Sequence, residues 1–182
     1  MGVLEKKWYA VYTRSRAEKK LYRLLCGKNI TSFLPLKKEL KQRSDRKKWI
    51  ESPLLPSYLF VQISESHHID VLNTPGAVRY ICFEGKPTAI PEYQILYLQH
   101  LVANKPQSIE ILYGDIEPGD NVEVVAGPLK GVKGEVLLIK GGYRILLRFE
   151  SLGCCVHAEI SQHELAPVER KSNGDQRTAA TR

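Results

Sequence analysis

The order of apolar and polar residues predicts a strand followed at once by a helix near the start of the chain. Trp8 to Tyr12 reads WYAVY, a short apolar run of the kind that forms a buried strand. Ser15 and Glu18 then have the spacing of a capping box, which predicts that a helix begins here. The positions that should face inward recur at helical spacing and are Ala17, Leu21, Leu24 and Leu25.

A long polar hairpin is predicted next. Residues 37–48 (KKELKQRSDRKK) are almost wholly polar, and Ser44 and Asp45 within them favour a turn. They lie between an extended segment and the run SYLFVQI at 57–63, which is the strongest strand signal in the chain. We therefore interpret 33–63 as a hairpin whose charged tip projects from the body.

The remaining pattern divides the chain into two units. A short helix over 67–73, a strand over 78–83 and a helix over 91–102 complete the first unit. Residues 104–118 contain prolines near both ends and show no period, which indicates a linker between independent units. Beyond this linker, Gly and Pro separate five predicted strands, at 121–125, 134–139, 143–149, 156–160 and 165–168.

These elements predict a chain of the α+β fold class. Residues 6–104 should form an N-terminal antiparallel sheet flanked by helices, and 105–117 a linker. Five short strands within about 50 residues predict a small β-barrel over 118–168. Residues 169–182 have no apolar anchor, so we expect a disordered tail.

Composition favours a globular protein over a disordered or membrane-spanning one. Of 182 residues, 43% are hydrophobic and 26% charged, and no apolar run approaches the roughly 18 residues of a spanning helix. The start lacks the patterns of a signal peptide and of myristoylation, so we expect a cytoplasmic protein. Four cysteines should then be reduced and act as small buried hydrophobic side chains, namely Cys26, Cys82, Cys154 and Cys155.

Positive charge is concentrated in the first 50 residues. They hold 15 Lys or Arg against 4 Asp or Glu, whereas the rest holds 12 against 16, for a formal net charge of +7. A basic field of this density favours a polyanion such as nucleic acid as the partner. A solvated helix face beside a charged loop would produce the same count, so both interpretations stay open at this point.

No pattern predicts catalysis, a metal site or a cofactor. His67 and His68 are adjacent, so their side chains diverge and do not match the one-face spacing of a zinc-protease helix. His100, His157 and His163 are isolated along the sequence. A nucleotide-binding glycine loop and a serine nucleophile elbow are both missing. We therefore expect a binding protein that is not an enzyme.

Aromatic residues gather on the predicted strands of the first unit, at Trp8, Tyr9, Tyr12, Tyr58, Phe60, Tyr80 and Phe83. Because side chains alternate along a strand, Tyr58 and Phe60 should point the same way. The residues alone leave two interpretations, a hydrophobic core or an exposed docking patch for a protein. Base stacking by this sheet is disfavoured, because SYLFVQI lacks the glycine and basic residue of the RNA-recognition signature.

Both units carry motifs that resemble one known family. GDNVEVVAGPLKGVKGEV, from Gly119 to Val136, looks like a KOW motif, whose glycines let the first strands of an SH3-like barrel bend around Pro128. The first unit is similar to the NusG N-terminal domain in the segments WYAVYTRSRAEKK, LPSYLFV and TPGAVRYI. In order and spacing, most of the chain therefore resembles the NusG family of transcription elongation factors.

The resemblance implies that the first unit docks on the clamp helices of RNA polymerase beside the upstream DNA. The matching positions of the clamp-helix pocket are Tyr12, Leu55, Tyr58, Phe60, Tyr80 and Phe83. His67 and His68 correspond to a contact with the polymerase gate loop. That contact is threonine-rich in one subgroup, whereas this chain has Ile69 and Asp70 there.

Two basic groups are implied to meet nucleic acid. In specialised members, positions on the first helix face the exposed non-template strand, and here they are Arg14, Arg16, Lys19, Lys20 and Arg23. The hairpin adds Arg43, Arg46, Lys47 and Lys48. This long basic hairpin looks most like that of the Bacteroides-type paralogues, which are antiterminators of capsular polysaccharide operons.

The implied function is a monomeric factor without a cofactor, which grips the polymerase clamp and the DNA of the transcription bubble. Holding both would suppress pausing and termination. The KOW unit is implied to recruit a ribosomal protein or a termination factor. A general housekeeping NusG and a ribosomal, rRNA-binding KOW protein stay open as alternatives. Binding to a membrane surface is disfavoured, because the basic helix lacks a broad apolar face.

Overall fold

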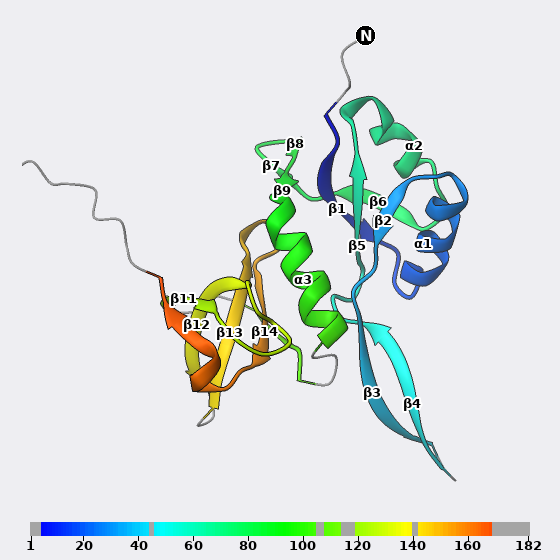
Figure 1. The fold of residues 1–182 in the computed structure, drawn as a ribbon. Coiled ribbons are helices and arrows are strands. Elements are labelled where there is room, and N and C mark those ends of the chain that lie inside the picture. Colours follow the sequence, from blue (N-terminus) through cyan, green and yellow to red (C-terminus); the bar gives the residue numbers. More distant parts are fainter. Residues whose placement is uncertain (1–4, 44–45, 105–107, 114–118, 140–141, 169–182) are drawn as a thin grey trace, which may run out of the picture.

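Two antiparallel sheets lie on either side of the helix α3 (Glu92–Asn104) in the computed structural model of the chain (Figure 1). The structure describes residues 5–43, 46–104, 108–113, 119–139 and 142–168. The turn predicted at Ser44 and Asp45, much of the predicted linker and the predicted tail over 169–182 lie outside the described residues. Within the described ranges, no helix is both long and apolar enough to cross a membrane.

The N-terminal sheet is built around one central pair of strands. Its strand order is β2–β5–β1–β6, and β9 also pairs with β1. The bounds are β1 (Lys7–Thr13), β2 (Thr31–Phe33), β5 (Tyr58–Ile63), β6 (Ala77–Tyr80) and β9 (Ala89–Ile90). β1 and β5 pair from Lys7 opposite Ile63 to Tyr12 opposite Tyr58. Because side chains alternate, this pair presents apolar residues to both faces of the sheet.

Helices cover one of these faces. They are α1 (Glu18–Gly27), the short 3₁₀ helix η1 (Glu65–His67) and α2 (His68–Leu72) (Figure 1). The buried residues of this layer include Leu21, Leu25 and Val71 from the helices and Tyr9, Val11, Leu59 and Val61 from the strands. Leu24, predicted to face inward, is 37% exposed, because the helix buries only a narrow stripe.

The predicted capping box at the start of α1 does not form. Ala17 occupies the N-cap position, and no side chain caps the helix there. The carboxylate of Glu18 is buried and accepts the backbone N–H of Ser57 at 2.8 Å. Glu18 therefore ties α1 to the start of β5 instead of capping its own helix with Ser15.

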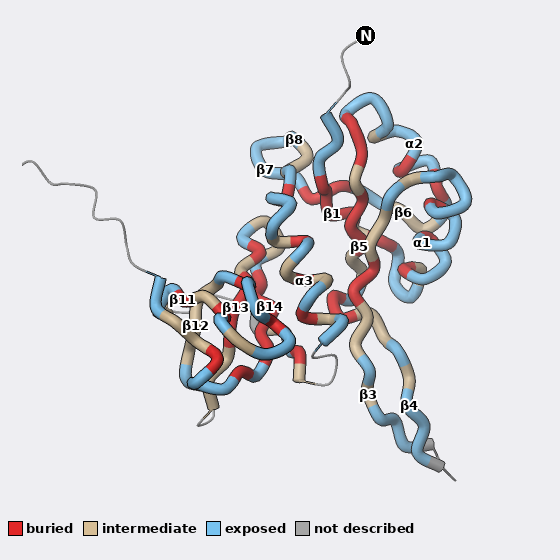
Figure 2. Tube along the Cα trace, in the orientation of Figure 1, coloured by how far each residue is buried: buried red, intermediate tan, exposed pale blue. Residues whose placement is uncertain are grey.

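β3 (Leu36–Arg43) and β4 (Arg46–Pro53) form the predicted hairpin, which projects from the body as a separate two-stranded sheet (Figure 1). The ladder is continuous from Leu36 opposite Pro53 at the base to Arg43 opposite Arg46 near the tip. The described residues of both strands are exposed or half-buried, as the pale blue and tan hairpin in Figure 2 shows. The hairpin is therefore held by its ladder and its base, without a core beneath it.

The strand predicted over 78–83 divides into β6 and part of a second, small hairpin. β7 (Cys82–Phe83) pairs with β8 (Lys86–Pro87). Glu84 and Gly85 turn the chain between them, with φ values of +50° and +78°. This hairpin leaves the ring of Phe83 71% exposed.

All four cysteines are unpaired thiols, but only two of them are buried. Cys154 and Cys155 lie in the second sheet, and burial raises the pKa of the Cys154 thiol to about 11. Cys26 and Cys82 are exposed, which corrects the expectation that all four act as buried hydrophobic side chains. Their positions at the end of α1 and in β7 explain the exposure.

The C-terminal sheet contains the five predicted strands and one more. Its order is β10–β14–β13–β12–β11–β15, with every pair antiparallel. The bounds are β10 (Glu110–Tyr113), β11 (Asp120–Val124), β12 (Lys133–Ile139), β13 (Gly142–Phe149), β14 (Cys154–Glu159) and β15 (Leu165–Pro167), with 3₁₀ turns η2 (Glu150–Leu152) and η3 (Gln162–Glu164). β10 falls inside the segment predicted as a linker, where it extends the sheet along β14.

Glycines and one ion pair shape the C-terminal sheet. Gly127 and Gly131 have φ values of +75° and +88°, and between them the chain bends around Pro128, as the motif predicts. The Arg148 guanidinium donates to both carboxylate oxygens of Glu135, at 2.6 and 2.8 Å. These hydrogen bonds hold the pKa of the Glu135 carboxyl below its usual value.

The two sheets share one hydrophobic core and are not independent units. The second face of the N-terminal sheet, with Trp8, Ala10 and Phe60, packs in the same cluster as α3 and the C-terminal sheet. The rings of Phe60 in β5 and Phe149 in β13 lie 5.9 Å apart between centroids. Figure 2 shows buried segments on both sides of α3. The linker composition could not reveal this packing, because it depends on apolar faces far from the linker.

Phe149→Ala should lower the free energy of unfolding by about 3–5 kcal/mol, the usual cost of removing a buried phenylalanine ring. Phe149 is fully buried in the shared core, so removal of its ring leaves a cavity whose lining side chains lose packing contacts. Urea unfolding measures the change. Phe83→Ala is the matched control, and because Phe83 is exposed it should change stability by less than about 0.5 kcal/mol. Equal effects of the two substitutions would contradict the shared core.

Candidate functional site

The cationic residues predicted on and before α1 are all exposed. They are Arg14, Arg16, Lys19, Lys20 and Arg23. They point outward because the buried stripe of α1 faces the sheet. Arg16 lies in the turn before the helix with a φ of +60°, and its neighbour Arg14 is held there by a backbone hydrogen bond to the carbonyl of Gly76 at 2.9 Å.

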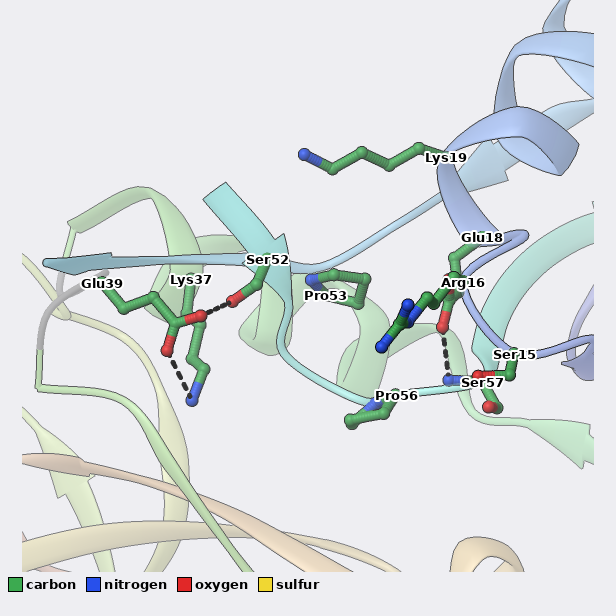
Figure 3. A pocket seen from close by; sticks show the side chains of 10 residues that line it. All are labelled: Ser15, Arg16, Glu18, Lys19, Lys37, Glu39, Ser52, Pro53, Pro56 and Ser57. Atoms are coloured by element: carbon green, nitrogen blue, oxygen red, sulfur yellow. Dashed lines mark hydrogen bonds and ion pairs between the residues drawn. The ribbon is translucent and has the colours of Figure 1, made fainter. Parts of the chain in front are cut away.

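A cleft separates the start of α1 from the base of the β3–β4 hairpin (Figure 3). Its volume is about 450 Å³. We call it the cationic cleft, and its lining residues are Ser15, Arg16, Glu18, Lys19, Lys37, Glu39, Ser52, Pro53, Pro56 and Ser57. It therefore joins cations from two segments that are far apart in the sequence.

The two carboxylates in the cationic cleft are already engaged. Glu18 accepts the N–H of Ser57, and Glu39 accepts the hydroxyl of Ser52 at 2.7 Å (Figure 3). Glu39 also lies 3.8 Å from the Lys37 ammonium and 3.4 Å from that of Lys41. The Ser52 hydrogen bond, and after it the nearby lysines, lower the pKa of Glu39. These acids are therefore fixed as local partners.

Other cations of the cationic cleft keep their charge unneutralised. Within the described ranges, neither Arg16 nor Lys19 forms an ion pair with a carboxylate. The Lys19 ammonium donates instead to the backbone carbonyl of Glu51 at 2.7 Å, which links α1 to β4. A phosphate oxygen would supply the charge partner that these two side chains lack.

The hairpin continues the positive surface away from the body. Lys41 and Lys48 lie directly opposite each other in the ladder. Like charges directly opposite each other destabilise a pair of strands. Lys47 and Lys48 are exposed, whereas the side chains of Arg43 and Arg46 lie outside what the structure describes. A bound polyanion would relieve this repulsion.

Four of the six predicted pocket residues lie together on one face of the N-terminal sheet. The half-buried rings of Tyr12 and Tyr58, which we call the tyrosine pair, meet edge to face with centroids 5.6 Å apart. The guanidinium carbon of Arg79 lies 5.4 Å from the centre of the Tyr12 ring. Leu55 and Phe60 are fully buried in the core shared with the C-terminal sheet.

Tyr80 and Phe83 do not join that group. Val11 pairs with Tyr80, which places Tyr80 on the opposite, helix-covered face of the sheet. There its hydroxyl donates to the carbonyl of His68 at 3.0 Å, and burial raises its pKa. Phe83 lies on the separate β7–β8 hairpin. The six positions therefore do not form a single pocket.

The two predicted gate-loop histidines differ in their surroundings. His67 is exposed, and its Nδ1 lies 2.8 Å from the hydroxyl of Ser64. His68 is half-buried between the rings of Tyr9 and Tyr80, at centroid distances of 4.7 and 4.8 Å. Burial there lowers the pKa of His68. Only His67 is therefore freely presented to a partner.

Several residues at these surfaces were not predicted from the sequence. Lys37 lines the cationic cleft, Arg79 covers the Tyr12 ring, and Trp49 stands exposed on β4. The signal for Trp49 was its place, with Ile50 as its one apolar neighbour, at the end of a long polar stretch. Among the described residues, no group of three or more His, Cys, Asp or Glu side chains is placed to hold a metal ion.

Comparison with known proteins identifies the family. Residues 6–99, just over half of the chain, match the family model described as transcription termination factor NusG. The transcription termination/antitermination protein NusG of Staphylococcus carnosus (strain TM300) is 25% identical over 146 residues, covering 72% of this chain and 78% of its own. That of Staphylococcus aureus (strain Mu50) matches with the same identity and coverage.

A solved structure supports the fold over nearly the whole chain. It describes domain interaction in Thermotoga maritima NusG, and superimposes with a TM-score of 0.53 at 18% identity, covering 92% of this chain and 100% of that one. At this identity the likeness concerns the fold alone. The match of the family model over residues 6–99 decides the assignment, and the chain belongs to the NusG family.

Proposed function

We propose that this protein is an antitermination factor that binds transcribing RNA polymerase through the tyrosine pair and binds DNA of the transcription bubble through the cationic cleft. The first contact would be made with the clamp helices of the polymerase. Family membership supports a role in transcription termination or antitermination. The exposed, unneutralised cations of the cationic cleft support a polyanionic partner.

One observation carries the proposal: the two surfaces meet at the start of β5. Ser57 lines the cationic cleft, and the next residue, Tyr58, belongs to the tyrosine pair. The N–H of Ser57 is held by Glu18 of α1, so the helix that carries the cations is fixed to the strand that carries the aromatic ring. A rigid link of this kind lets one molecule hold a protein and a nucleic acid at a set distance.

Simultaneous binding explains how a factor without catalysis can act on transcription. A protein that binds the closed, elongating polymerase more tightly than the paused or opening state shifts the population toward elongation. Bridging the clamp and the DNA supplies this difference, because both contacts hold only while the clamp is closed. Phe60 packs against Phe149 of the C-terminal sheet, so its ring could contact the polymerase only after that sheet moves away.

Lys19→Glu with Lys20→Glu should weaken DNA binding and reduce the slope of log affinity against log salt by about 2, because two phosphate contacts are lost. Binding of a bubble-containing DNA, measured by fluorescence anisotropy at several salt concentrations, tests this. The matched control reverses Lys86 and Lys130, which are equally exposed but lie on β8 and in the C-terminal unit. If both double variants lose the same slope, only the net charge matters and the cationic cleft is not the binding site.

Tyr58→Ala should lower the affinity for elongating RNA polymerase by about tenfold or more, as expected for a central aromatic contact. The fold should persist, because Tyr58 is only partly buried and its edge-to-face partner Tyr12 remains. Co-sedimentation with assembled elongation complexes measures the affinity. Tyr93→Ala is the matched control, since Tyr93 is exposed and has its own aromatic neighbour, Tyr97, at 5.8 Å. Unchanged binding by the Tyr58 variant would contradict the proposed contact.

We further propose that the factor is specialised and acts on polysaccharide biosynthesis operons. The support is the basic hairpin over 36–53, which resembles that of the Bacteroides-type antiterminators. Deletion of the gene should reduce the distal part of one or a few long transcripts, and RNA sequencing with and without the gene measures this. Genome-wide changes would indicate a general NusG instead. Recovery of ribosomes in preference to polymerase by the tagged protein would favour an rRNA-binding protein.

A further inference from the structure

The chain contains two tryptophans in opposite environments. Trp8 in β1 is 7% exposed and belongs to the shared core, whereas Trp49 in β4 is 54% exposed. Trp49 lies midway along the projecting hairpin, where the ladder has no core beneath it. A large aromatic ring in this position gains little burial from the fold. With the exposed Leu40 opposite it, Trp49 forms an apolar patch that is available to a partner.

We call each cross-strand pair of the hairpin a level. Trp49 belongs to an apolar level, and the neighbouring levels on the same face are polar. It pairs with Leu40, which is 48% exposed. On the same face, alternation places the pair Lys38–Glu51 on the side of the body and Gln42–Lys47 on the side of the tip. The two polar levels are about 13 Å apart, from four residues of strand rise. The Trp49 ring is therefore flanked by Lys38 on the side of the body and by Lys47 on the side of the tip.

A hollow lies beside the Trp49 ring. Trp49, Lys38, Ile50 and Glu51 line a space of about 520 Å³. The carbonyl of Glu51 accepts the hydrogen bond of Lys19, which also lines the cationic cleft. Alternation places Lys37, Glu39 and Ser52 of the cationic cleft on the other face of the ribbon. The hollow and the cleft therefore flank the same hairpin from its two faces, and the Lys19–Glu51 contact lies between them.

We propose that the Trp49 level of the hairpin binds an unpaired base of a single-stranded nucleic acid. The indole stacks on the base, and Lys38 and Lys47 contact the flanking phosphates. Stacking on an exposed aromatic ring between cations is the general mode by which proteins hold single strands. A duplex cannot use this surface, because its bases are already stacked. The inference deepens the DNA-binding half of the proposed function and rests on it.

Charge favours this occupant over an apolar protein segment. On the face that carries Trp49 the cations are Lys38 and Lys47, one on each side of the ring, whereas Lys41 and Lys48 lie on the opposite face. The acid on this face is Glu51, which is opposite Lys38 in the ladder. An apolar helix or strand placed on Trp49 and Leu40 would bring no partner for these lysines, whereas a phosphate backbone does.

Tryptophan fluorescence of the full chain tests the proposal. Titration with a twelve-residue oligothymidylate should quench the emission, because a base stacks on Trp49 while Trp8 stays buried. Trp49→Phe should keep the single-strand affinity within about threefold but lose the quenching. Trp49→Ala should lower that affinity about tenfold, in the range of one lost stacking contact. Its affinity for a twelve-base-pair duplex should change by less than about twofold.

Controls separate this inference from the proposed function. Tyr93→Ala, on α3, should leave single-strand affinity unchanged. An oligouridylate arm distinguishes RNA from DNA, and binding to either or both supports the recognition of unpaired bases. If Trp49→Ala binds the single strand with the affinity of the wild type, the inference is overturned. If the Lys19 and Lys20 reversals still weaken bubble DNA binding, the proposed function stands without it.

A protein partner gives a different result. Trp49→Ala would then reduce polymerase affinity without any change in single-strand affinity, and this outcome also overturns the inference. Circular dichroism and the thermal midpoint check that each variant is folded. Because Trp49 is exposed, both should match those of the wild type.

Discussion

The pairing of β1 with β5 is the constraint on which the rest of the molecule depends. Its register places Tyr9, Val11 and their β5 neighbours under the helices, and Ala10, Tyr12, Tyr58 and Phe60 on the other face. A slip of one residue would exchange the two faces. The same strand that supplies Phe60 to the shared core begins at Tyr58, so the core and the proposed binding surfaces are built by one element.

The hairpin departs from the rules that stabilise the rest of the fold. A two-stranded ribbon is only marginally stable by itself, and this one also opposes lysine to lysine. Its base compensates: the N–H of Leu54 donates to the carbonyl of Pro35 at 2.8 Å, and Lys19 and Ser52 add side-chain hydrogen bonds. Like charges that weaken a ladder are typical of residues that serve binding.

Local pattern predicted the elements well and the contacts between them poorly. Most predicted strands, the hairpin and α3 followed from alternation, turn residues and proline positions. The capping role of Glu18 was wrong, because its partner Ser57 lies 39 residues away. The six residues predicted to form one pocket do not share one face of the sheet. Tyr80 pairs with Val11 in the ladder and therefore lies on the helix-covered face. Neither the shared core nor the cationic cleft could be predicted, because each joins segments distant in sequence.

The central claim is that one module presents an aromatic contact and a cationic contact at the start of β5. Hydrogen–deuterium exchange of the full chain, alone and bound to a transcribing polymerase on a nucleic-acid scaffold, tests it most directly. The account predicts slower exchange in α1, in the hairpin over 36–53 and at the start of β5 in the complex. Protection confined to the C-terminal sheet, with α1 and the hairpin unchanged, would contradict it.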